Sequence, residues 1–293
     1  LLLSLPAGMS RHWLFKRDVW LQMGGFRAEA GNAMELDYIL RLIEAQGFDG
    51  LGHVSEPLLI CDALKLKDCP DERAVIQRHL LARGFQEARV GSRLPGCYDL
   101  DYGVEDNALV SILILVKGGL GKVQRCLETV LAETSYPHYE VLLLDQGNVE
   151  PVLLEWLAGV EQLDTEHIRV LRFADIPALQ VRNQAAELAR GEFLLWLDSG
   201  IAVFEAEWLQ QLLNHAARPE VGAVGAKLLG GDRSVRQAGL VLGLGGVEGR
   251  AFTGLSPDAP GYLQRLQIDQ NYTALGGQCL MLRKHLFIEA GGF

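Results

Sequence analysis

The sequence predicts an α/β fold with a mostly parallel sheet flanked by helices, and three observations support this prediction. From residue 110 onward, short apolar runs alternate with amphipathic stretches of helical period. Two of the apolar runs end at acidic residues, Asp145 and Asp198. A segment near the N-terminus also recurs 267 residues later, and so long a period indicates whole domains in tandem.

The predicted elements follow one another as strand, helix, strand. Residues 110–116 form an uninterrupted apolar run typical of a buried strand, and residues 121–134 place their apolar side chains on one helical face. Further strands are expected at 140–144, 168–173 and 193–197, and helices at 151–163 and 179–190, the last closed by Gly191. Because parallel sheets bind ligands beyond the carboxyl ends of their strands, Asp145 and Asp198 should face one cleft.

The repeat suggests the domain organisation. FKRDVWLQMGGF at residues 15–26 resembles LRKHLFIEAGGF at residues 282–293. We expect residues 1–61 to be the C-terminal part of a first domain, 62–108 a connector, and 109–293 a second domain of the same kind, truncated at its C-terminus. The connector should hold one helical stretch at 72–87 and turns from 91 to 106. Residues 1–7 suggest a truncated strand better than a signal peptide, and both chain ends suggest a fragment.

Composition excludes several classes of protein. The chain is 49% hydrophobic and 22% charged, as in ordinary globular proteins, and its net charge of −10 argues against nucleic-acid binding. Five widely spaced cysteines without a metal-ligand pattern predict reduced, structural thiols: Cys61, Cys69, Cys97, Cys126 and Cys279. The longest apolar runs are far shorter than the roughly 20 residues of a transmembrane helix, so none is expected.

Several motifs in register carry a resemblance to a known family. They are VSILILV (110–116), YPHYEVLLLDQGN (136–148), RN (182–183), RGEFLLWLD (190–198), RPEVGAVGAKLL (218–229), QAG (237–239) and ALGGQCLMLR (274–283). In this order and spacing they resemble the family 2 glycosyltransferases, which have the Rossmann-like GT-A fold. A Rossmann dehydrogenase is a poorer interpretation because no GxGxxG follows the first strand.

The resemblance implies a nucleotide pocket. Asp145 is expected to contact the base, and Arg182 and Asn183 to lie in the same pocket, where an arginine fork suits a carboxylate or phosphate. Lys117, in the loop after the first strand, could meet a phosphate. The alternatives are a turn or helix cap for Asp145, a solvated helix face or local cap for Arg182 and Asn183, and a surface lysine for Lys117.

The resemblance also implies a divalent cation, Mg²⁺ or Mn²⁺. The family ends the strand before this site with Asp-x-Asp, whose carboxylates hold the ion against the sugar diphosphate. This chain has Asp198-Ser199-Gly200, so Asp198 is the expected metal ligand and the second carboxylate is missing. A weakened metal site follows, and the activity of this copy is in question.

The remaining site residues come from the same resemblance. Gly276, Gly277 and Gln278 occupy the place of a turn near the donor sugar and acceptor, although glycines equally suit a tight turn. In the first copy, Glu35 matches the family's catalytic base and Asp37 lies beside it. A base is needed because a sugar hydroxyl is a poor nucleophile until a carboxylate accepts its proton. The alternative for both is a carboxylate stabilised by a helix N-terminus.

Two functions therefore remain open. The first is an inverting glycosyltransferase that moves a sugar from a UDP- or dTDP-sugar type of donor to a glycan or lipid-linked acceptor in cell-surface polysaccharide biosynthesis. It would work in the cytoplasm, and peripheral association with the inner face of the membrane is left open. The second is a catalytically degenerate module that binds nucleotide or glycan, or scaffolds an active neighbour; the missing carboxylate favours it.

Overall fold

The chain divides into two compact units in the computed structural model, which describes residues 2–8, 12–54, 56, 58, 60, 66–104, 107–174, 176–243 and 246–293. Unit 1 comprises Leu1–Gly103 with Ser256–Asn271, and unit 2 comprises Val104–Leu255 with Tyr272–Phe293. The connector expected at 62–108 therefore belongs mainly to unit 1. No helix of the described ranges is long and apolar enough to cross a bilayer.

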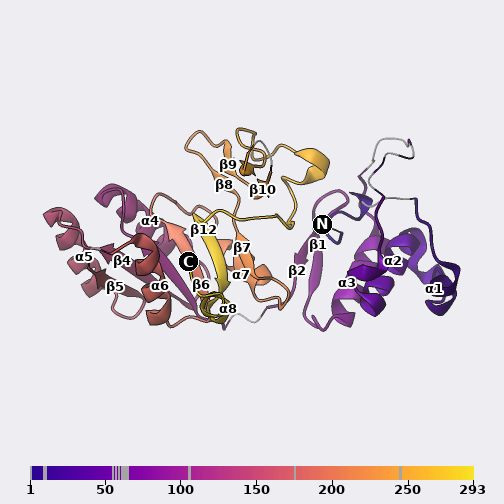
Figure 1. Ribbon diagram of the computed structural model, residues 1–293, viewed down its shortest axis with the longest axis horizontal. Coiled ribbons are helices and arrows are strands. Elements are labelled where there is room, and N and C mark those ends of the chain that lie inside the picture. The colour runs from indigo at the N-terminus through magenta and orange to yellow at the C-terminus, as the bar shows by residue number, and fades with distance from the viewer. Residues whose placement is uncertain are drawn as a thin grey trace. The chain divides into compact units, whose positions relative to one another are not determined.

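Unit 2 is built on a six-stranded sheet in the order β5-β4-β3-β6-β12-β7. Strands β4, β5, β6, β12 and β7 of this sheet are labelled in Figure 1. Strands β3 to β6 are mutually parallel, whereas β12 is antiparallel to both β6 and β7. The main elements are β3 (Val110–Leu115), α4 (Leu120–Glu133), β4 (Tyr139–Gln146), α5 (Pro151–Leu163), β5 (Ile168–Phe173), α6 (Ala178–Leu188), β6 (Phe193–Asp198), α7 (Trp208–Ala216), β7 (Ala223–Gly225), β12 (Cys279–Arg283) and α8 (Lys284–Glu289). The expected α/β fold with a mostly parallel sheet is confirmed.

Helices cover both faces of this sheet because its central strands are apolar on both sides. One core cluster joins alternate strand residues, such as Ile112 and Leu195, to α4, α5 and α7. The other joins the intervening residues, such as Leu194 and Trp196, to α6 and α8. Four short strands, β8 (Leu228–Leu229), β9 (Val235–Gln237), β10 (Leu240–Leu242) and β11 (Glu248–Arg250), form two separate hairpins. The central parallel strands bring the ends of β3, β4 and β6 to one edge.

Unit 1 is mainly helical. Its elements are η1 (Pro6–Gly8), α1 (Arg17–Gln22), η2 (Ala28–Ala33), α2 (Met34–Gln46), η3 (Phe48–Gly50), α3 (Pro70–Ala82), β1 (Arg89–Leu94), β2 (Cys97–Asp101) and η4 (Tyr262–Gln264). The aromatic rings of Phe15, Trp20 and Tyr38 pack together in its core, with centroids about 5 Å apart. Helix α3 packs against α2 through a hydrogen-bonding contact between His79 Nδ1 and Glu44 Oε1 at 2.7 Å.

Three local expectations were wrong. Residues 2–8 form turns and η1 in place of a strand. The turn-rich stretch 91–106 contains most of the antiparallel hairpin of β1 and β2, whose glycines hid its strand character. Gly191 does not close α6, which ends in Ala189 as its C-cap; a Cβ at Gly191 would lie 2.6 Å from the Ser111 backbone nitrogen, so close packing explains this glycine.

The two copies of the sequence repeat have the same local conformation. Helices α1 and α8 coincide in their bounds when shifted by the 267-residue offset, and each is followed by two glycines of positive φ. Gly25 N donates to Trp20 O at 3.1 Å in the first copy, as Gly292 N donates to Phe287 O at 3.0 Å in the second. The left-handed glycines end the helix, and the phenylalanine that follows packs against an aromatic ring of that helix: Phe26 against Trp20, and Phe293 against Phe287.

Candidate functional site

Asp145 is buried near the end of β4 and holds the turn that follows this strand. Its Oδ1 accepts hydrogen bonds from the Asn148 backbone nitrogen at 3.1 Å and from Asn148 Nδ2 at 2.6 Å. One carboxylate oxygen is thus committed to the turn, as the alternative interpretation of this residue expects. Contact with a nucleotide base through the remaining oxygen stays a prediction.

Residues 198–200 form a tight loop at the end of β6. The exposed Asp198 accepts a hydrogen bond at Oδ1 from the Gly200 backbone nitrogen at 2.8 Å. The buried Ser199 donates from Oγ to the carbonyl oxygen of Lys117 at 2.8 Å. The loops after β3 and β6 are therefore tied together, which brings Lys117 and Asp198 to the same edge of the sheet.

The residues of this loop do not fit the two-carboxylate metal site that the sequence resemblance implies. Asp198 supplies one carboxylate, one of whose oxygens already accepts the Gly200 N–H, and position 200 has no side chain. A Cβ at Gly200 would lie 3.0 Å from Asp198 Oδ1, so a side chain there would shift the Asp198 carboxylate from its present position. Within the described ranges, no three His, Cys, Asp or Glu side chains group together as metal ligands.

Arg182 and Asn183, adjacent on α6, have different surroundings. The Arg182 guanidinium carbon lies 5.7 Å from the Trp196 ring centroid and 5.6 Å from that of Phe293. Burial lowers the pKa of this guanidinium, and the charge of Asp198 opposes that shift. Asn183 instead hydrogen-bonds the Phe293 backbone, donating to its oxygen at 3.2 Å and accepting from its nitrogen at 3.0 Å. Arg182 thus remains oriented toward the strand end, whereas Asn183 holds the Gly-Gly-Phe turn.

Two basic residues at this edge were missed by the sequence reasoning. Arg125, on α4, donates from Nη2 to the Gly200 carbonyl oxygen at 3.1 Å. Lys122, in the first turn of α4, lies over the preceding glycine loop, since a Cβ at Gly118 would be 3.2 Å from its Cδ. The sequence signal for both was their place at the start of the helix that follows β3, because such helices begin at the carboxyl edge of a parallel sheet.

The segment 276–278 passes beside Asp198 through its backbone. Gln278 O accepts a hydrogen bond from Asp198 N at 2.8 Å, which places this residue at the edge of the sheet where Lys117 lies. Gly276 adjoins the buried side chain of Gln237, and a Cβ there would overlap the Gln237 amide. Gly277 has open space around it. Close packing therefore explains Gly276, while a ligand contact at any of the three residues stays a prediction.

Glu35 and Asp37 lie in unit 1 and have different environments. Asp37 is buried and pairs with Arg41 at 2.8 Å, and Arg41 donates to the carbonyl oxygens of Met23 and Gly25, both at 2.6 Å. Arg78 approaches the other Asp37 oxygen at 3.4 Å. Asp37 therefore anchors the Gly-Gly turn through Arg41, whereas Glu35 is exposed.

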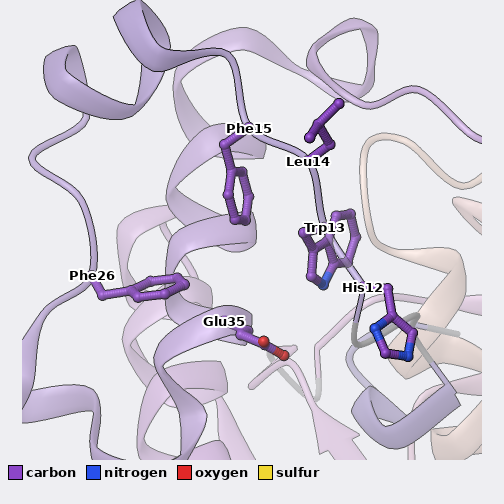
Figure 2. Close-up of a pocket in the computed structure, with 6 residues that line it drawn as sticks. All are labelled: His12, Trp13, Leu14, Phe15, Phe26 and Glu35. Atoms are coloured by element: carbon purple, nitrogen blue, oxygen red, sulfur yellow. The ribbon is translucent and has the colours of Figure 1, made fainter. Parts of the chain in front are cut away.

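Glu35 lines a pocket of about 510 Å³ together with His12, Trp13, Leu14, Phe15 and Phe26. Figure 2 shows the Glu35 side chain directed toward the part of the pocket where Trp13 and His12 lie. By the repeat offset, residues 12–16 correspond to β12, yet they form no strand here. Leu14 is 100% exposed, whereas its equivalent, Met281, is 0% exposed in the sheet core of unit 2. The two copies therefore share the helix that follows, α1 or α8, whereas the segment before it is a strand only in unit 2.

In a comparison with known protein families, residues 111–291 match the family described as Glycosyl transferase family 2. The chain is 33% identical over 298 residues to the O-antigen biosynthesis protein RfbC of Myxococcus xanthus, which covers 97% of this chain and 23% of that protein. It is 31% identical over 283 residues to the uncharacterized protein y4gI of Sinorhizobium fredii, covering 92% and 31%. The chain thus spans less than a third of the length of either relative.

A similarity to a solved structure supports the fold. The structure of GalNAc-T7 with UDP, GalNAc and Mn²⁺ matches with a TM-score of 0.51 and 19% sequence identity, over 68% of this chain and 39% of that one. The alternation of parallel strands and helices in unit 2 is thus a known arrangement.

Proposed function

The chain belongs to glycosyl transferase family 2, and from this premise we propose that unit 2 is a nucleotide-sugar-binding module of a polysaccharide-building glycosyltransferase. The observation that carries the proposal is the match of residues 111–291, which includes the edge where Lys117, Asp145 and Asp198 lie. The relationship to an O-antigen biosynthesis protein supports cell-surface polysaccharide as the product. A glycan or lipid-linked sugar is the proposed acceptor.

The proposed donor is a nucleotide sugar of the UDP or dTDP type. Asp145 is proposed to accept a hydrogen bond from the base, because one of its oxygens is free of the Asn148 turn. Arg182 is proposed to hold the diphosphate, because a guanidinium fork matches phosphate oxygens in geometry and charge. GalNAc-T7, which has a similar fold, was solved with UDP.

The sugar-transfer step is proposed to invert the anomeric centre, with a carboxylate as general base. Glu35 is the candidate for this role in a first catalytic domain of the longer protein, because it is exposed in a pocket and sits at the start of α2. The matching copies of the helix and Gly-Gly-Phe turn support a tandem of two such domains. The protein is proposed to work in the cytoplasm, where nucleotide sugars are available.

The test of this function is nucleotide binding by the whole chain. Calorimetric titration with UDP, dTDP and GDP should reveal saturable binding of one of them, weakened about tenfold or more by Asp145→Asn, because a carboxylate is a stronger acceptor than an amide. Asp164→Asn is the matched control and should bind normally, because the partly exposed Asp164 before β5 likewise accepts the backbone N–H three residues on, from His167. Absence of binding by all three nucleotides would contradict the proposal.

A second candidate function is a module that binds nucleotide without transferring sugar. Gly200 favours it, because the loop after β6 has a single carboxylate, and one oxygen of that carboxylate accepts the Gly200 N–H. The two functions differ in turnover: a degenerate module would bind the donor yet neither hydrolyse it nor transfer its sugar. Release of nucleoside diphosphate from each bound donor, measured in the full-length protein with an acceptor glycan, distinguishes them.

A further inference from the structure

A diphosphate bound at the carboxyl edge of this sheet needs positive charge beside it. Divalent cations commonly supply this charge and are themselves held by carboxylates and phosphate oxygens. Here each described carboxylate has one oxygen engaged, since Asp198 Oδ1 accepts the Gly200 N–H and Asp145 Oδ1 accepts two hydrogen bonds from Asn148, and position 200 adds no carboxylate. The donor set at this edge does not suit a resident metal.

Positive side chains are present at the same edge in a chain whose net charge is −10. Arg125 contacts the Gly200 carbonyl oxygen, Lys117 accepts the Ser199 hydroxyl through its backbone, and Lys122 lies over Gly118. Arg182, on α6, lies on the face of the sheet opposite α4, where its guanidinium contacts the Trp196 ring. Asp198 is two residues after Trp196 on β6, so both side chains lie on this face. Arg125 therefore contacts the loop of residues 198–200 directly, and the other three basic residues belong to elements that meet at the same edge of the sheet.

Among these basic residues, Arg182 has an oriented guanidinium whose hydrogen-bond donors are available to a ligand. Its guanidinium contacts the rings of Trp196 and Phe293, and within the described residues it makes no hydrogen bond or ion pair. Ring contacts hold the planar group in one orientation and leave its N–H donors unpaired. A pyrophosphate group offers the matching acceptors, and a paired fork of this kind gives strong, oriented hydrogen bonds.

We propose that unit 2 binds the diphosphate of its nucleotide ligand without a divalent cation, with Arg182 as the principal phosphate ligand and Arg125, Lys117 and Lys122 supplying the remaining charge. The inference rests on the proposed nucleotide-binding function and adds how the phosphate charge is neutralised. It explains how a module with Gly200 in place of the second carboxylate can retain a donor site. It also assigns Asp198 to the geometry of the loop, through the Gly200 N–H.

The test is calorimetric titration of the whole chain with UDP, dTDP and GDP, once in excess EDTA and once in excess Mn²⁺. We expect the same affinity in both conditions for the nucleotide that binds. Arg182→Met should weaken binding by about tenfold or more, the loss expected for a charge-assisted hydrogen-bonding pair. Arg190→Gln is the matched control, because Arg190 lies at the opposite end of β6 and its side chain is 60% exposed; its affinity should be unchanged.

Asp198→Asn separates the two ways of neutralising phosphate. If cationic side chains bind the diphosphate, removing this negative charge should leave the affinity unchanged or raise it. If a metal ion does so, the affinity in Mn²⁺ should fall sharply. The thermal midpoint of Arg182→Met, compared with that of the unmutated chain, shows whether the variant is folded; the EDTA comparison on the unmutated chain is independent of any variant.

The outcomes separate this inference from the proposed function. Equal binding in EDTA and Mn²⁺, lost in Arg182→Met and kept in Arg190→Gln, supports it. Binding that requires Mn²⁺ and disappears in Asp198→Asn overturns it while leaving the nucleotide-binding function intact. Absence of nucleotide binding under both conditions overturns both.

Discussion

The glycines at the candidate site differ in the surroundings that explain why each position is a glycine. Gly276 adjoins the buried amide of Gln237, a Cβ at Gly277 would have no neighbour within 4 Å, and the Gly200 N–H donates to Asp198 Oδ1. A glycine in a motif therefore does not by itself indicate a ligand. The neighbouring atoms decide whether close packing or backbone exposure explains it.

The pair Gly276 and Gly277 gives a direct test at the residue scale. Gly276→Ala should destabilise unit 2 by about 1–3 kcal/mol, because the new methyl group would force the buried Gln237 amide to move. Gly277→Ala is the matched control and should change the free energy of unfolding by less than about 0.5 kcal/mol. Urea denaturation measures both, and equal effects of the two substitutions would contradict this interpretation of Gly276.

Helices α2 and α3 are joined by polar groups as well as by their apolar faces. His79 on α3 is buried and its Nδ1 lies 2.7 Å from Glu44 Oε1 on α2. Burial is the larger influence and lowers the pKa of His79, although the charge and hydrogen bond of Glu44 act to raise it. The neutral imidazole is therefore favoured in the folded unit relative to the unfolded chain.

This contact predicts a pH dependence. A histidine whose folded pKa lies below its ordinary value of 6.5 binds fewer protons when folded than when unfolded. Its contribution to stability is thus complete above that ordinary value and is lost as the pH falls below it. We expect the thermal midpoint of unit 1 to fall between about pH 7.5 and about pH 5.5, and His79→Gln to flatten that fall.

His53→Gln serves as the control for this pH series because His53 is exposed in the same unit. It should keep the slope of the unmutated chain. A slope unchanged in His79→Gln would show that other groups, such as carboxylates, cause the pH dependence.

At the scale of the whole molecule, each unit has its own core and its own buried polar anchor. In unit 1, Asp37 pairs with Arg41, which holds the turn at Gly25. In unit 2, Gly191 packs against the backbone of residues 109 and 111, and its N–H donates to Ser111 Oγ at 2.8 Å. Separate cores predict separable responses to substitution.

Differential scanning calorimetry of the whole chain should resolve a separate unfolding transition for each unit. Asp37→Asn should destabilise unit 1 by about 3–5 kcal/mol, because it leaves the buried Arg41 charge without its partner. Gly191→Ala should destabilise unit 2, since its Cβ would clash with backbone atoms that cannot rotate away. Each substitution should lower one transition and leave the other in place. A single transition lowered by both would contradict independent unfolding of the units.

Much of unit 2 could be predicted from the sequence, because its elements have strong periodicity. The runs at 110–116 and 193–197 are apolar throughout and lie in the two-sided core as β3 and β6, and the bounds of α5 and β5 were predicted without error. The hairpin of β1 and β2 was missed because its residues are mixed and its pairing joins positions that local patterns do not relate. Strand pairing outside an apolar core leaves a weak signal.

The α/β architecture of unit 2, the repeated helix and glycine turn, and the lack of a second carboxylate at Gly200 can all be read from the sequence, since period, repetition and residue identity are properties of the chain alone. Tertiary structure decided which matched residues are still available to a ligand. Asn183 is committed to the Phe293 backbone and Asp37 to Arg41, whereas Arg182 keeps its donors unpaired beside Trp196. A side chain's partners depend on distant segments brought together by folding, and those contacts are not recorded in any local pattern.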